Sequence, residues 1–159
     1  MYRLLANPEH IAPLRQEIDA VVAEEGWTKA GIDKMHKVDS FLRESQRVDG
    51  LNLCSLFTVS TSENEMLIYV RHVFPVIMTR LALRPFTFSN GVTVPAGTLV
   101  TVPASAIHAD ERNYPNPDKF DGFRFSRLRE SEGNTATSRY QAVSTSTENL
   151  AFGLGRHTW

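Results

Sequence analysis

Two oppositely charged side chains, Glu44 and Arg47, stand three residues apart in a segment whose pattern predicts a helix. Residues three apart share one face of a helix, so the carboxylate and the guanidinium can pair. On a solvated face such a pair contributes only about 0.3–0.5 kcal/mol to stability. Taken alone, the pair is typical of an ordinary surface ion pair and does not indicate a functional one.

Other reactive residue types show no recognisable pattern. The five histidines lack the spacing of metal ligands. Cys54, the single cysteine, stands in a leucine-rich stretch and resembles a small buried hydrophobe. Gly153-Leu154-Gly155 lacks the third glycine and the flanking strand and helix of a phosphate-binding loop.

Length and charge narrow the class of protein. A chain of 159 residues is long enough for one domain, and a net charge of -1 gives no reason to expect nucleic-acid binding. One cysteine excludes an internal disulfide and fits a reducing setting. The most apolar run, residues 66–78, is shorter than the ~20 residues that span a bilayer, so we expect no membrane anchor in this chain.

The helices are the clearest predicted elements. Asn7 and Pro8 are typical of a helix start, Gly26 is typical of a helix end, and an apolar stripe connects them: Ile11, Leu14, Ile18, Val21 and Val22. A short helix or turn is expected over residues 30–35. The helix that carries Glu44 and Arg47 is expected over residues 39–48.

After residue 80 the pattern predicts strands. Asn90-Gly91 favours a tight hairpin turn between residues 86–88 and 92–94. A strand over 98–102 and a short helix over 104–108 follow. Residues 110–125 predict an irregular coil with packed phenylalanines, and residues 131–148 predict a solvated loop.

Three segments in order give the sequence a specific resemblance. They are Glu44-Ser45-Gln46-Arg47, the run Pro117-Asp118-Lys119-Phe120-Asp121-Gly122-Phe123-Arg124-Phe125, and Phe152-Gly153-Leu154-Gly155-Arg156-His157-Thr158. In this order they strongly resemble the C-terminal part of a cytochrome P-450. The resemblance is to fungal members that oxidise terpenoids and other secondary metabolites, and it covers nearly the whole chain except residues 57–78.

The resemblance implies a fold and a set of site residues. The fold is mainly α with a small β-hairpin or sheet: a partial cytochrome P-450 domain over 1–159, with the J and K helices, β hairpins, the meander and the start of the haem-binding loop. Glu44 and Arg47 form the family's E-x-x-R pair, and Arg124 completes a charge network that holds the haem-binding loop. Phe152 and Gly155 match positions of that loop, while His157 and Arg80 match cationic partners of the haem propionates.

The resemblance also implies a function. Its members are haem-thiolate monooxygenases, which insert one oxygen atom from O2 into a small lipophilic substrate and take electrons from a reductase. The full-length member is expected on the cytosolic face of the endoplasmic reticulum membrane, with its oxygen-activating helix, most of its substrate pocket and its anchor before Met1. The chain as given is expected to be cytosolic and, as an isolated domain, marginally stable.

Two departures from the family pattern matter. Trp159 stands where the family has the cysteine whose thiolate binds the haem iron, and an indole has no lone pair for a metal. Residues 57–78 are an atypical insertion with the composition of a translated intron, and a cysteine codon split after two bases and followed by an intron's opening G reads as tryptophan. Sequencing of spliced transcripts tests both hypotheses. The alternative function is a non-catalytic product that binds no haem, either a truncated or mis-spliced gene model or an interaction module.

Overall fold

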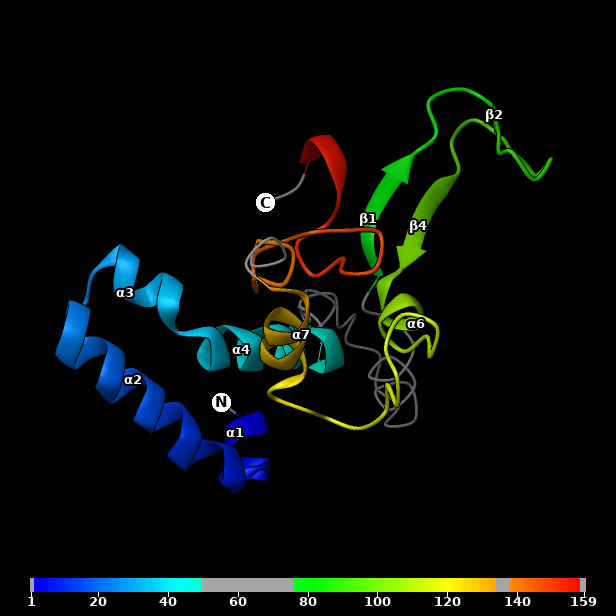
Figure 1. Cartoon of the computed structure of the whole chain (residues 1–159). Helices are drawn as coiled ribbons and strands as arrows, with labels where there is room; N and C mark the ends of the chain where they lie inside the picture. Colours follow the sequence, from blue (N-terminus) through cyan, green and yellow to red (C-terminus); the bar gives the residue numbers. More distant parts are fainter. Residues whose placement is uncertain (1, 50–75, 134–137, 158–159) are drawn as a thin grey trace, which may run out of the picture.

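The computed structural model describes residues 2–49, 76–133 and 138–157, and its elements form a helical part and a β arm. The helical part contains α1 (Tyr2–Ala6), the 3-10 turn η1 (Pro8–His10), α2 (Ile11–Glu25), α3 (Lys29–Lys34), α4 (His36–Asp49) and α7 (Arg124–Glu132). Helix α4 contacts both α2 and α7 and is the central helix of this part (Figure 1). The predicted fold class, mainly α with small sheets, is confirmed.

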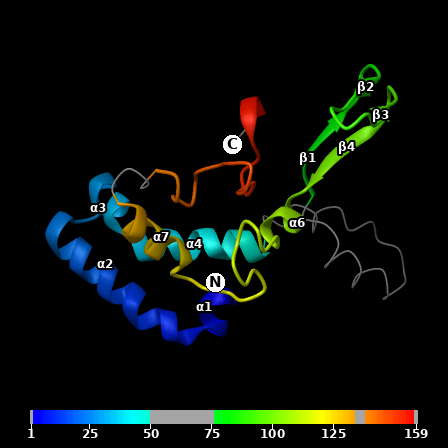
Figure 2. The same cartoon turned by 45° about the vertical axis from the view of Figure 1, so that its right-hand side comes forward.

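The β arm consists of two antiparallel strand pairs. Strand β1 (Val76–Leu81) pairs with β4 (Leu99–Pro103), and β2 (Phe86–Thr87) pairs with β3 (Thr93–Val94) in the predicted hairpin. Gly91 has a φ of 86°, the left-handed conformation that this turn requires. Figure 2 shows the arm extending away from the helices, to which it is joined by α6 (Ala104–His108).

The start of strand β1 falls within the segment predicted as an insertion. Val76 pairs with Pro103 and Ile77 with Val102, so the last residues of the 57–78 range belong to the sheet. Residues 57–75, together with Cys54, lie outside the described residues. The insertion therefore stays a prediction.

The two ends of helix α2 differ in how well the sequence predicted them. Gly26 ends the helix as expected, with a φ of 66° and its N–H donating to the carbonyl of Val22. Asn7 lies at the N-cap position and Pro8 begins the first turn as expected, but this turn is 3-10 and Asn7 makes no side-chain cap, because its Nδ2 donates to the carbonyl of Arg3. The side-chain amide thereby satisfies a carbonyl at the end of α1.

Helix α4 begins earlier than predicted because its cap comes from another helix. The carboxylate of Glu17, on α2, accepts the backbone N–H groups of Lys37 and Val38 at 2.9–3.0 Å. A carboxylate at this position satisfies free donors and complements the helix dipole. The helix therefore starts at His36 rather than at Asp39.

The coil predicted over residues 110–125 and the loop predicted over 131–148 are partly wrong. Helix α7 occupies Arg124–Glu132, and beyond it Tyr140, Ala142 and Asn149 are buried. The hydroxyl of Ser40, on α4, accepts the N–H of Phe125 at 3.1 Å and donates to the carbonyl of Gly122 at 2.9 Å. The start of α7 is thus capped across the structure, which local sequence does not reveal.

The core is unusually polar. Among the residues that the structure describes, the largest side chains that are less than 2% exposed are Glu44, Asn149 and Ser40. The buried rings of Phe125, Tyr114 and Tyr140 form a separate aromatic cluster. Buried polar groups are stable only when they are hydrogen-bonded, so this core depends on specific hydrogen bonds as well as on apolar contact.

We predict that Ser40→Ala lowers the free energy of unfolding by about 1–3 kcal/mol, because it leaves a buried N–H and a buried carbonyl without a partner. Urea unfolding followed by circular dichroism measures the change. Ser45→Ala is the matched control, since the Ser45 hydroxyl donates to Phe41 within the same helix and its loss costs less than about 0.5 kcal/mol. Equal effects of the two substitutions would contradict the prediction.

Candidate functional site

The carboxylate of Glu44 lies at the centre of the site and is completely buried. Arg47, one turn along α4, donates from Nη2 to Oε1 at 2.8 Å and from Nε to Oε2 at 2.9 Å. Arg124 donates from Nε to Oε1 at 3.3 Å, and the backbone N–H of Asp121 donates to the same oxygen at 3.1 Å. The structure therefore brings the three predicted network residues into one hydrogen-bonded group.

The remaining N–H groups of Arg47 bind backbone carbonyls far along the chain. Nη1 donates to the carbonyl of His108 at 2.7 Å and Nη2 to that of Pro117 at 2.8 Å. The guanidinium also lies over the ring of Tyr114, 5.2 Å from its centre. One side chain thus joins α4, the end of α6 and the proline-rich loop.

Arg124 likewise binds backbone carbonyls, those of the proline-rich loop between α6 and α7. It donates from Nη1 to the carbonyl of Pro115 at 2.7 Å and from Nη2 to the carbonyls of Asn116 and Lys119 at 3.4 and 3.2 Å. Asn116 has a φ of 51°, the left-handed conformation that asparagine tolerates better than most residues. Because this loop lacks the ladder of a helix or sheet, the guanidinium satisfies its carbonyls instead.

Electrostatics favour this arrangement over a simple pair. A buried carboxylate with one cation is costly to desolvate, but here it accepts four hydrogen bonds and faces two guanidiniums. The extra positive charge is spread over five backbone carbonyls. The Glu44–Arg47 pair is therefore an internal support and not the surface ion pair that the spacing alone allowed.

His108 extends the network to the C-terminal loop, and the sequence analysis did not single it out. Its Nε2 accepts the backbone N–H of Leu150 at 3.0 Å, while its carbonyl accepts from Arg47. Burial, and next the charge of Arg47, lower the pKa of His108 to about 4. The ring is therefore neutral at pH 7, with Nδ1 carrying its proton. The one sequence signal for His108 is its position at the end of the short helix that follows a strand.

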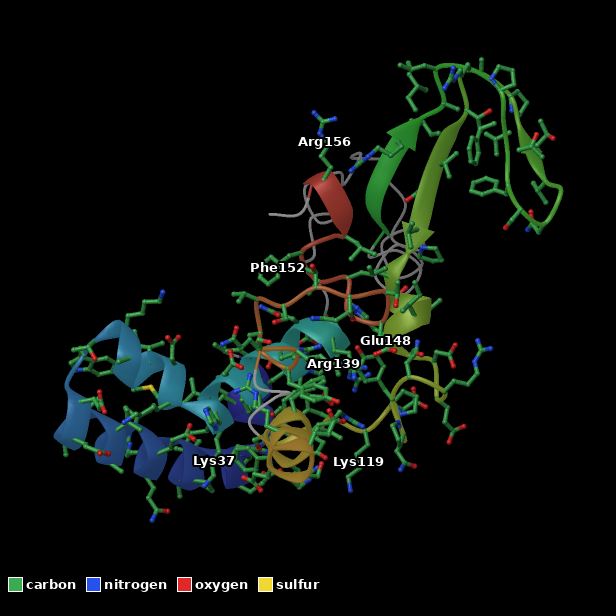
Figure 3. The ribbon with its side chains drawn as sticks, turned by 45° about the horizontal axis from the view of Figure 1, so that its top comes forward. Lys37, Lys119, Arg139, Glu148, Phe152 and Arg156 are labelled. Carbon is green, nitrogen blue, oxygen red and sulfur yellow. The ribbon has the colours of Figure 1, made fainter. Side chains whose placement is uncertain are left out.

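The residues predicted to contact the haem lie outside this network. Arg80 is exposed on β1, and its Nη1 donates to the carbonyl of Thr79. Phe152 is half-buried, and Gly155, with a φ of 82°, begins the 3-10 turn η4 (Gly155–His157). Figure 3 shows Phe152 and Arg156 on this last segment, with Arg156 projecting away from the fold. The side chain of His157 and the whole of Trp159 lie outside the described residues.

Comparison with known proteins identifies the family. The family model described as Cytochrome P-450 matches residues 64–158. Cytochrome P-450 monooxygenase 103 of Postia placenta is 42% identical, cytochrome P-450 monooxygenase janQ of Penicillium janthinellum is 40% identical, and an ent-kaurene oxidase of Gibberella fujikuroi is 36% identical. Each match covers 99% of this chain and 27% of the relative. The chain belongs to the cytochrome P-450 family and spans about a quarter of the length of these relatives.

The residues present fit one part of the haem that the family binds and not the other. An added Cβ at Gly155 would meet open space, and the exposed guanidiniums of Arg80 and Arg156 are suitable partners for propionates. The iron end is different, because Trp159, which the resemblance places at the axial-cysteine position, offers an indole without a lone pair for a metal. Within the described residues no three His, Cys, Asp or Glu side chains form a metal site.

In the part of the chain that the structure describes, no helix has the length and apolarity to cross a membrane.

We predict that Glu44→Gln lowers the free energy of unfolding by about 3–5 kcal/mol, because it removes the charge that compensates a buried guanidinium. The ion pair Asp110–Arg112 provides the control: Arg112 is 88% exposed, so Arg112→Gln should leave the urea midpoint almost unchanged. Urea midpoints give both values, and near-ultraviolet circular dichroism shows whether the first variant has lost its tertiary packing altogether. A Glu44→Gln variant as stable as the Arg112→Gln variant would contradict the prediction.

We also predict that stability falls as the pH is lowered from 6.5 towards 4. The pKa of His108 is lower in the folded chain than in the unfolded chain, so the unfolded state binds the proton first and protonation favours unfolding. Lowering the pKa of His108 from 6.5 to about 4 corresponds to about 3 kcal/mol of folding stability, and this contribution is fully present above pH 6.5. Denaturant titrations across this range measure the slope, and His108→Gln should flatten it.

Proposed function

We propose that this chain is the part of a haem-thiolate monooxygenase that holds the haem-binding loop, and that Glu44, Arg47 and Arg124 are the residues that brace it. The observation that carries the proposal is the continuous set of hydrogen bonds from Glu44 through Arg47 and His108 to the backbone of Leu150. Leu150 lies two residues before Phe152, where the loop motif begins. The network is a support for the loop and does not itself react.

The activity of the whole enzyme follows from the family and belongs to the proposal. Haem supplies oxygen activation in this family, and the substrate is a small lipophilic molecule that receives one oxygen atom. The name of the Gibberella fujikuroi relative, an ent-kaurene oxidase, supports a terpenoid-like substrate class. A redox-partner reductase and the cytosolic face of the endoplasmic reticulum complete the proposed setting.

In this chain the described residues have a structural part in that activity. Arg80 and His157 are proposed to bind the propionates, while Phe152 and Gly155 shape the loop. Trp159 offers the iron no lone pair, so we assign no oxygen chemistry to the chain as given. Residues 57–78 are proposed to be an insertion foreign to the family pattern.

We predict that haem added to the purified full chain gives no thiolate-type band in the carbon monoxide difference spectrum of the reduced form, because position 159 has no thiolate. Trp159→Cys is the matched variant and should gain the band. A thiolate band from the unaltered chain would overturn the assignment of Trp159. If haem shifts the absorbance of neither protein, the alternative of a non-catalytic product is favoured instead.

A further inference from the structure

A cavity of about 590 Å³ lies beside α7, between the side of that helix, the loop after α6 and the segment that follows residue 138. Its lining carries two carboxylates, Asp121 and Glu148, and an excess of positive charge. The five guanidiniums on it belong to Arg43, Arg112, Arg124, Arg127 and Arg139. The cavity therefore has the electrostatic character of an anion site.

Arg43 is the residue that distinguishes this cavity from an ordinary basic surface. It is 4% exposed, its guanidinium lies 4.5 Å from the ring centre of Phe125, and its Nη1 donates to the carbonyls of Arg139 and Gln141. Its Nε is buried without a hydrogen-bond partner, and among the described residues no carboxylate pairs with it. Burial lowers the pKa of this guanidinium, as expected for a cation with little compensation.

Of the exposed arginines of the cavity, Arg112 and Arg127 are hydrogen-bonded to Asp110 and Asp121, and Arg139 has the weakest partner. Nη2 of Arg139 lies 3.6 Å from Oε2 of Glu148, which is too far for a hydrogen bond. The two side chains are 59% and 47% exposed. Figure 3 shows both on the segment above α7. Because an exposed ion pair contributes little to stability, an incoming anion can replace Glu148 as the partner of Arg139.

We propose that this cavity binds a phosphate group, either as inorganic phosphate or as a phosphate monoester. Guanidiniums recognise phosphate oxygens through paired N–H donors, and the hydroxyls of Ser131 and Ser146 on the lining add neutral donors. Leu128 and Tyr140 line the same cavity and provide apolar surface for an organic group attached to the phosphate. The cavity shares two residues, Arg124 and Asp121, with the Glu44 network. A phosphate bound in the cavity would leave the hydrogen bonds of these two residues to Glu44 in place.

The test uses the unaltered full chain at constant ionic strength and pH 7.5. Urea midpoints are measured in sodium phosphate and in sodium chloride, and calorimetric titrations compare inorganic phosphate with phenyl phosphate. Phosphate should raise the midpoint where chloride does not, because a ligand that binds only the folded state stabilises it. Tighter binding of phenyl phosphate would assign the site to monoesters, and equal binding would assign it to inorganic phosphate.

Three variants separate a built site from general charge. Arg139→Gln should weaken phosphate binding about two- to fivefold, and Glu148→Gln should strengthen it because it removes a competing carboxylate. Arg15→Gln, on the exposed side of α2 away from the cavity, makes the same charge change as Arg139→Gln and should leave binding unaltered. Equal midpoints in phosphate and chloride, or equal weakening by Arg15→Gln and Arg139→Gln, would overturn the proposal.

Discussion

The fold depends on the buried carboxylate of Glu44 more than on any apolar contact. It binds two guanidiniums, and these in turn satisfy five carbonyls of segments that form no regular ladder. A guanidinium has five donors fixed in one plane, so it can bind a carboxylate and several carbonyls at once, which a lysine cannot do. The irregular loop between α6 and α7 is ordered because arginines substitute for the neighbours that a helix or sheet would provide.

Elements that carry their own start and stop signals could be predicted from the sequence, and elements stabilised by distant residues could not. Gly26 and Asn90-Gly91 act locally, so the end of α2 and the hairpin of the arm were predicted correctly. Helix α7 has a strongly polar sequence and takes its cap from Ser40, more than eighty residues away. The early start of α4 depends on Glu17 in the same way.

The same distinction applies to the candidate site. The resemblance to the family was enough to expect one network of Glu44, Arg47 and Arg124, which their types and spacing alone did not indicate, and the geometry brings them together. His108 was missed because a single histidine has no pattern, and its importance comes only from the two backbone groups that it joins. The family match covers residues 64–158 and so includes His108 and Arg124, while the parts of Glu44, Arg47 and Trp159 in haem binding belong to the proposal.

The hydrogen bonds of α4 to distant residues also bear on how much the connection between α4 and β1 can lengthen without loss of stability. Arg47 and His108 are 61 residues apart in sequence, and Asp39 and Ala142 are 103 apart, so folding must close long loops around one helix. The entropy of closing a flexible loop grows only with the logarithm of its length. Adding twenty-two residues between α4 and β1 therefore raises the cost of the Arg47–His108 closure by only about 0.4 kcal/mol. By this entropy argument, the network can tolerate large changes in the length of the connection after α4.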